Sequence, residues 1–161
     1  MSVFVIGIGS SGVHAEKLVH HALGRLESSR SWRVLSRSEL YANPAVGNAT
    51  HARFVNAAVV VETHLVPRTL LLALFAIENE VGRIRTVPNA ARTLDLDILW
   101  SPGLMAPLDS PAIPHPRLLE RPFAAIPALE ALKRAGRFAQ FPLVEAARRL
   151  SCNARMEMTK A

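Results

Sequence analysis

The order of secondary-structure signals along the first hundred residues limits the fold more than any other feature of this chain. Four segments have the apolar or alternating character of strands, and these are residues 3–8, 32–41, 54–63 and 93–100. Two segments have apolar residues at helical spacing, 13–26 and 67–81. The predicted order is therefore strand, helix, strand, strand, helix, strand.

The two predicted helices each have an apolar stripe. In the first helix the stripe consists of Val13, Leu18, Ala22 and Leu26. In the second, which Pro67 opens and Gly82 ends, it consists of Leu70, Leu71, Leu74, Ile77 and Val81. A βαββαβ order is that of a ferredoxin-like α+β sandwich. We therefore expect segments 32–41 and 54–63 to pair as antiparallel strands.

The remainder of the chain predicts additional C-terminal helices. A proline-rich connection follows residue 100 and leads to helical signals near residues 128–135 and 142–150. We expect residues 1–130 to form one domain. Residues 131–161 should form a basic helical extension that packs on this domain or trails from it.

Composition and charge exclude several classes of protein. Residues 1–120 hold 11 Lys or Arg against 10 Asp or Glu, whereas residues 121–161 hold 8 against 3. The positive charge is therefore a property of the tail, which we interpret as solvated, and we expect no nucleic-acid partner.

The longest apolar run is too short to span a membrane. The single Cys152 excludes an internal disulfide and suits a reducing compartment. We expect a cytoplasmic protein, monomeric or weakly dimeric.

Asp95 and Asp97 form the first candidate site. Residues two apart in a strand point to the same face, so both carboxylates should converge on one region. Two such carboxylates, together with phosphate oxygens, are a common site for Mg²⁺. Arg83, Arg85 and Arg92 lie within fifteen residues of the pair, and guanidinium groups commonly neutralise phosphates. This stretch predicts a nucleoside triphosphate site, with an exposed acidic strand as the alternative.

Residues 92–99, RTLDLDIL, resemble the signature of the 6-hydroxymethyl-7,8-dihydropterin pyrophosphokinase family of folate biosynthesis. Three further stretches match that family in order and spacing. These are FVNAA at 54–58, the pair IE at 77–78 followed by GRIR at 82–85, and PHPR at 114–117 leading to RPF at 121–123. With the opening GSS and the segment SELYANPAVG, the resemblance covers roughly residues 3–130.

The resemblance implies a Mg²⁺-dependent transfer of pyrophosphate from ATP to the hydroxymethyl group of the pterin, giving AMP. It implies that Asp95 and Asp97 bind two Mg²⁺ ions. The implied ATP-binding residues are Arg83, Arg92, Ile98, His115 and Arg121, of which Arg83 and Arg92 are also catalytic. The implied pterin-binding residues are Pro44, Val46, Phe54, Asn56 and Phe123, with the two aromatic rings sandwiching the pterin.

The chain also departs from the family pattern. Ala90 and Ala91 stand where the family has Gly-Pro before the signature arginine, and Ser11 replaces an asparagine. Alanine gives a loop less conformational freedom than glycine does. These changes leave open an alternative, in which the chain is a non-catalytic or altered-substrate paralogue that binds a pterin or a nucleotide.

Three other functions need to be weighed against this interpretation. Residues 7–12, GIGSSG, match the glycine fingerprint of a Rossmann dinucleotide site, but no crossover helix precedes the third strand. A nucleic-acid-binding module on the same scaffold would need paired aromatic residues on the sheet, which the strands lack. Histidines are numerous, at positions 14, 20, 21, 51 and 64, but their spacing gives no ligand pair, and we expect them to be solvated.

Overall fold

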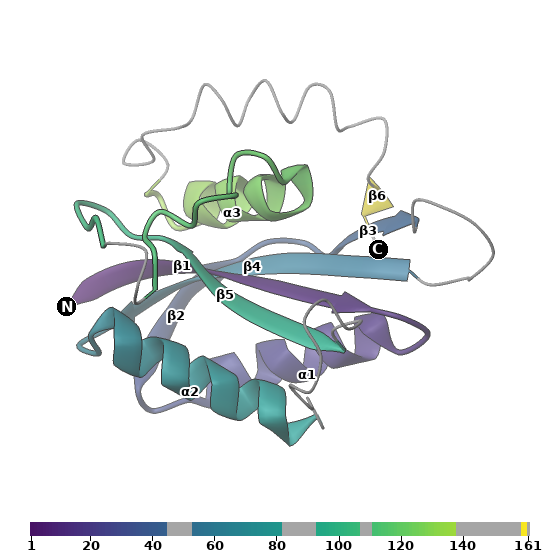
Figure 1. Ribbon diagram of the computed structural model, residues 1–161, viewed down its shortest axis with the longest axis horizontal. Coiled ribbons are helices and arrows are strands. Elements are labelled where there is room, and N and C mark those ends of the chain that lie inside the picture. The colour runs from purple at the N-terminus through teal and green to yellow at the C-terminus, as the bar shows by residue number, and fades with distance from the viewer. Residues whose placement is uncertain (45–52, 82–92, 107–110, 138–158, 161) are drawn as a thin grey trace.

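The computed structural model describes residues 1–44, 53–81, 93–106, 111–137 and 159–160. Its elements are β1 (Ser2–Ser11), α1 (Ala15–Ser28), β2 (Trp32–Arg37), β3 (Tyr41–Pro44), β4 (Arg53–Thr63), α2 (Pro67–Glu80), β5 (Leu94–Trp100), α3 (Pro122–Arg134) and β6 (Thr159–Lys160). In Figure 1 a single sheet separates α1 and α2, below it, from α3, above it. The described chain is thus a sandwich of three layers.

The sheet has the topology that the order of elements predicted. Its strands follow the order β5-β1-β4-β3-β6, β2 also pairs with β4, and the pairings are antiparallel. Each of the helices α1 and α2 connects strands that have one other strand between them, as in a ferredoxin-like fold. The predicted fold class is confirmed. The dinucleotide interpretation is wrong, because a Rossmann site needs parallel neighbours for β1 and both neighbours are antiparallel.

The sheet is buried on both faces, each by its own hydrophobic core. Phe4, Val59 and Leu96 lie in the core between the sheet and the helices α1 and α2, which contribute Leu23 and Leu74. A smaller core lies between the other face and α3, and it includes Val5, Ala58, Val60, Leu129 and Leu132. Burial on both sides explains why the middle of β4, residues 57–61, is apolar without alternation.

The predicted strand 32–41 is divided into β2 and β3. Leu35 is an extra residue, since Val34 pairs with Val61 and Ser36 with Val60. Ser38 then closes the gap between the two strands, because its N–H donates to the carbonyl of Ala58 and its hydroxyl accepts the N–H of Ala58, both at 2.9 Å. The side chain of Ser38 therefore replaces one backbone partner where the strand pairing is interrupted.

The helices differ from their predicted bounds. The first begins at Ala15, after Gly12 with φ of 104°, so that Val13 lies outside the helix and is 89% exposed. Its buried face includes Val19 and Leu23 rather than Val13 and Leu18. The helix expected at 128–135 begins six residues earlier, at Pro122, which suits a first helical position.

At its other end α3 continues past residue 130 to Arg134. The helix expected at 142–150 and Cys152 lie outside the described residues. Beyond them, β6 pairs with β3 at Tyr41 and Ala42. Within the described chain, no helix combines the length and the apolar character that crossing a membrane requires.

Candidate active site

A cleft opens on the α3 face of the sheet, beside the first turn of that helix. It is lined by Gly7, Ile8, Gly9, Asn56, Ala57, Asp95, Asp97, Leu99, His115, Leu118, Arg121, Phe123 and Ala124. Its volume is about 440 Å³, which includes the part open to solvent. Strands β1, β4 and β5 form its floor, and the segment from His115 to Ala124 forms one wall.

Strand β5 places both predicted metal ligands in this cleft. Its side chains alternate, so that Leu94, Leu96 and Ile98 are buried while Asp95 and Asp97 are half-buried on the opposite face. At a rise of about 3.4 Å per residue, the two carboxylates start about 7 Å apart along the strand. Two acidic side chains at this spacing can reach cations that lie about 4 Å apart, as in two-metal sites.

The cleft has a low floor because the middle strand carries glycines there. Gly9 pairs with Asn56 on one side and Asp95 on the other, while Gly7 pairs with Asp97. A Cβ atom on Gly7 would lie 2.9 Å from Cδ1 of Leu99, so the glycine lets that side chain lie across β1. The sequence interpretation treated these glycines as part of a dinucleotide fingerprint, and Gly9 also as the start of the GSS stretch of the family resemblance. Their pairing with residues of the predicted site was not foreseeable before the register of the sheet was known.

Strand β4 brings two of the predicted pterin residues to the same face. Asn56 lines the cleft directly. Phe54 precedes it by two residues on the strand, therefore on the same face, and is 42% exposed. An exposed phenylalanine next to Asn56 on the strand offers a flat surface for stacking.

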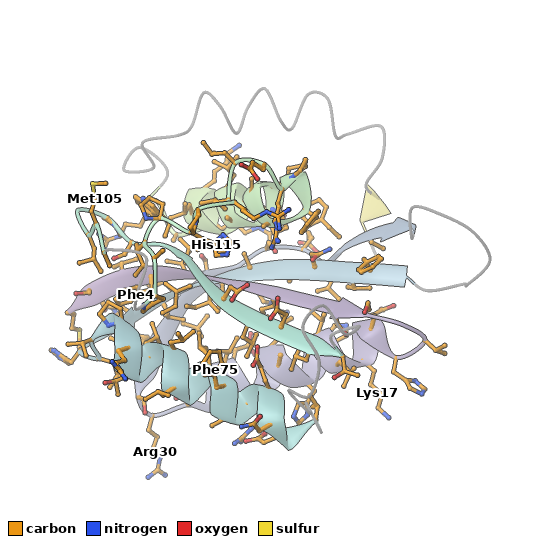
Figure 2. All side chains as sticks on the ribbon, in the orientation of Figure 1. Phe4, Lys17, Arg30, Phe75, Met105 and His115 are labelled. Carbon is orange, nitrogen blue, oxygen red and sulfur yellow. The ribbon has the colours of Figure 1, made fainter. Side chains whose placement is uncertain are left out.

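The wall of the cleft carries the predicted phosphate ligands. The backbone N–H of His115 donates to the carbonyl of Leu99 at 2.8 Å, which ties this segment to β5. The Nδ1 of His115 accepts the N–H of Arg117 at 3.2 Å. A neutral His115 therefore carries its proton on Nε2, so that Nε2 is a hydrogen-bond donor. Figure 2 shows His115 above the sheet, on the side of α3.

Arg121 and Phe123 complete the wall at the start of α3. Arg121 is the N-cap residue, and its guanidinium carbon lies 5.9 Å from the centre of the Phe123 ring. Phe123 is 37% exposed, although it is large and apolar. A guanidinium near the N-terminus of a helix favours bound anions. The arrangement therefore offers a positive anion site next to an exposed aromatic face.

The remaining predicted residues do not line the cleft or lie outside the described part. The Ile98 side chain is 2% exposed in the core on the opposite face, so only its backbone could meet a nucleotide. Pro44 ends β3, which pairs with β4 at residue 53. Val46, Arg83 and Arg92, together with the Ala90-Ala91 pair, lie outside the described residues.

The donor set of the cleft suits Mg²⁺ better than a metal held by protein alone. Among the described residues, no three His, Cys, Asp or Glu side chains gather in a way that could hold a metal ion. The cleft provides the oxygens of Asp95 and Asp97. Mg²⁺ is usually bound by one or two carboxylates, with substrate phosphates and water completing its shell. The residues present therefore fit such an ion once a phosphate substrate is bound.

The chain is similar in sequence to proteins of one enzyme family. Residues 5–133 match the family model of 7,8-dihydro-6-hydroxymethylpterin-pyrophosphokinase. A 2-amino-4-hydroxy-6-hydroxymethyldihydropteridine pyrophosphokinase of Pseudomonas aeruginosa is 35% identical over 122 residues, which cover 76% of this chain and 75% of the relative. The enzyme of the same name from Bacillus subtilis is also 35% identical, over 129 residues, covering 80% of this chain and 77% of its own length.

Solved structures show the same fold. A crystal structure of Plasmodium falciparum HPPK-DHPS with pterin and p-hydroxybenzoate matches with a TM-score of 0.68 at 10% identity, over 99% of this chain. The match covers 46% of that chain, so this protein spans about half of its length. The matched family model and the two bacterial relatives extend over most of this chain, and the predicted resemblance is confirmed: the chain belongs to the 7,8-dihydro-6-hydroxymethylpterin-pyrophosphokinase family.

Proposed function

We propose that this chain transfers the pyrophosphoryl group of ATP to the hydroxymethyl oxygen of 6-hydroxymethyl-7,8-dihydropterin, in a Mg²⁺-dependent step of folate biosynthesis that releases AMP. One observation carries the proposal: two carboxylates, a histidine, an arginine, an asparagine and an exposed phenylalanine share one cleft. The relatives are named as pyrophosphokinases for this class of pterin. On the sequence grounds given above, we place the reaction in the cytoplasm.

The two carboxylates serve the transferred group. Asp95 and Asp97 would hold two Mg²⁺ ions together with phosphate oxygens, and ions bound there would neutralise the charge that develops during transfer. The hydroxymethyl oxygen attacks the β-phosphorus and loses its proton to water. The bond from that phosphorus to the oxygen shared with the α-phosphate breaks, and AMP leaves with the electron pair. This chemistry requires positioning and charge stabilisation but no covalent intermediate on the protein.

The wall of the cleft serves the triphosphate. The Nε2–H of His115 donates to a phosphate oxygen, and the Arg121 guanidinium pairs with another. By family resemblance, Arg83 and Arg92 also neutralise the triphosphate. The backbone of Ile98, rather than its side chain, meets the adenine.

The other end of the cleft serves the pterin. Asn56 presents an amide with both donors and an acceptor to the polar edge of the ring. Phe54 and Phe123 cover its two faces, while Pro44 and Val46 contribute from the segment that follows β3. This assignment explains why two large aromatic side chains are left exposed on an otherwise well-packed face.

A turnover assay and a binding assay together test the proposal. The protein is mixed with ATP and the pterin, with and without Mg²⁺, and loss of the pterin alcohol is followed by chromatography. We expect consumption only with Mg²⁺ present. Calorimetric binding of both ligands without any turnover would contradict catalysis and favour the non-catalytic paralogue.

A further inference from the structure

The last turn of α2 contains a buried acid to which the reaction described above gives no role. Glu78 is 0% exposed, and it is the one charged side chain among the buried residues that the structure describes. Its neighbours Asn79 and Glu80 are exposed. Burial of a carboxylate is unfavourable unless hydrogen bonds or opposite charges compensate for the lost water.

Position 78 lies on the apolar face of α2, where an apolar residue is expected. Leu70 and Leu74 are both fully buried on the same face of α2, and Glu78 continues this series at a spacing of four residues. A leucine at position 78 would extend the apolar face without any polar atom to satisfy. The acid must therefore be explained by what its oxygens contact.

Glu78 forms a hydrogen bond to the strand that carries the two predicted metal ligands. Its Oε1 accepts the backbone N–H of Leu96 at 2.8 Å, and this contact is buried. Leu96 stands between Asp95 and Asp97. Among the strands that the structure describes, β5 is the last on its side of the sheet, and its one strand partner there is β1. The Glu78 carboxylate supplies the other edge with an acceptor where a further strand would have supplied a carbonyl.

This hydrogen bond acts on the peptide unit that joins Asp95 to Leu96. Fixing that unit fixes the twist of β5 between the two carboxylates, which leave the strand on the face opposite the Leu96 side chain. An unpaired edge strand has more freedom to twist and fray than a strand held on both sides. In Figure 1, α2 runs beneath β5, the orientation that this contact needs.

We infer that Glu78 is a positioning residue for catalysis: it holds the central peptide of β5 so that Asp95 and Asp97 meet the Mg²⁺–triphosphate complex without rearrangement. The inference rests on the proposed function of these two aspartates. It differs from a purely structural role in one respect. Loss of the acceptor should impair the geometry of the metal site even where the fold and its stability are retained.

Two variants at position 78 distinguish the loss of the hydrogen-bond acceptor from a change in packing. Glu78→Gln keeps the length of the side chain and a carbonyl oxygen for the Leu96 N–H. Glu78→Leu fills the same apolar space but offers no acceptor. Glu80→Gln is the matched control. It removes a carboxylate from the same helical turn, and that carboxylate belongs to an exposed residue and pairs with Arg25, 2.7 Å away.

The first measurement is hydrogen exchange of the Leu96 amide by NMR, with no ligand present. We expect slow exchange in the wild type, in Glu78→Gln and in Glu80→Gln, and much faster exchange in Glu78→Leu. The second is turnover as a function of Mg²⁺ concentration. For Glu78→Leu we expect kcat to fall by about 100-fold, the scale of a displacement of about 1 Å at a catalytic group. We also expect half-saturation at higher Mg²⁺, with little change in KM for the pterin.

Different outcomes of these measurements would contradict either the role of Glu78 or the proposed function. Wild-type kcat and Mg²⁺ dependence in a folded Glu78→Leu would overturn the inference, as would a Glu78→Gln variant as impaired as Glu78→Leu. If Glu78→Leu does not fold, Glu78→Gln and Glu80→Gln provide the test. The inference then requires near-normal kcat and a slowly exchanging Leu96 amide in both variants. Absence of turnover in the wild type would instead count against the proposed function, whatever the exchange of Leu96 shows.

Discussion

Asn56 on β4 and Asp95 on β5 lie on opposite sides of a single residue, Gly9 of β1, which pairs with both of them. With neighbouring strands about 4.8 Å apart, the backbones of Asn56 and Asp95 are about 10 Å apart. No side chain rises from β1 between them. A flat substrate can therefore lie across the middle strand, with one edge at the amide and its reacting group near the carboxylate.

Gly9→Ala tests this open floor. The added Cβ would lie 3.3 Å from Oδ1 of Asn56, tight enough to displace the amide or to occupy the space above β1. We expect the Kd for the pterin to rise by about tenfold, equivalent to about 1.4 kcal/mol, because the ring can no longer lie flat. Calorimetry with the pterin gives the Kd directly.

Gly24→Ala is the matched control for that substitution. Gly24 lies in α1, is exposed, and a Cβ there would meet nothing within 4 Å. It should leave pterin binding unchanged and stabilise the fold by about 0.5–1 kcal/mol, because alanine favours a helix. Equal pterin affinity in Gly9→Ala and Gly24→Ala would show that the substrate does not lie over Gly9.

Asp97→Ala should remove turnover while the protein remains folded. Loss of one of two carboxylates weakens the Mg²⁺ site, and we expect kcat to fall by about 1,000-fold or more, about 4 kcal/mol of transition-state stabilisation. Glu62→Ala is the control, since that carboxylate pairs with Arg33 near the other end of β4. Activity within about tenfold of wild type would rule out the metal assignment.

Phe123→Ala should weaken binding of the pterin more than binding of ATP. A stacked aromatic pair contributes about 0.5–1.5 kcal/mol beyond burial, which corresponds to a change in Kd of about 2- to 12-fold. Leu72→Ala is a control at another exposed apolar residue, on α2, which should alter neither affinity. Equal losses of affinity for the two ligands in calorimetry would mean that Phe123 only supports the start of α3.

Much of the site was predictable because strand geometry acts locally. The alternation of residues 93–100 is sufficient to place Asp95 and Asp97 on one face, and the structure has this pattern. The same alternation places the Ile98 side chain on the opposite face, a consequence that the family resemblance obscured. The resemblance supplied Asn56, His115 and the other distant members, which local patterns cannot bring together.

The features that were missed depend on contacts between distant segments. The break of the second strand at Ser38 rests on hydrogen bonds to Ala58, and local propensity contains no trace of them. The burial of Glu78 had a weak signal, its spacing of four residues from Leu74, but a glutamate at such a position is usually solvated. Only the packing of α2 beneath β5 shows that its carboxylate meets Leu96.

Tyr41 makes the stability of the folded protein depend on pH in the alkaline range. Its hydroxyl donates to Oε2 of Glu130 at 2.8 Å, which ties β3 to α3. Burial, and then the Glu130 carboxylate, raise the pKa of the Tyr41 phenol well above its usual value of about 10. The folded state therefore favours the protonated phenol. The resulting stabilisation is fully present below about pH 10 and decreases as the pH rises above that value.

Tyr41→Phe should lower the free energy of unfolding by about 1 kcal/mol at neutral pH, through loss of this hydrogen bond. Between about pH 9 and 11, the variant should lose less stability than the wild type. Urea denaturation at several pH values measures both effects. Since Tyr41 is the only tyrosine of the chain, ultraviolet titration reports its ionisation directly. A titration midpoint near the usual value in the folded protein would contradict this description.

The nucleotide left after one turnover tests the central claim most directly. The protein is incubated with Mg²⁺, the pterin alcohol and ATP labelled at the β-phosphate, and the products are separated by chromatography. Transfer of the pyrophosphoryl unit predicts unlabelled AMP and a labelled pterin product in equal amounts. Formation of labelled ADP, with no label on the pterin, would contradict the account, because it would mean transfer of the terminal phosphate alone.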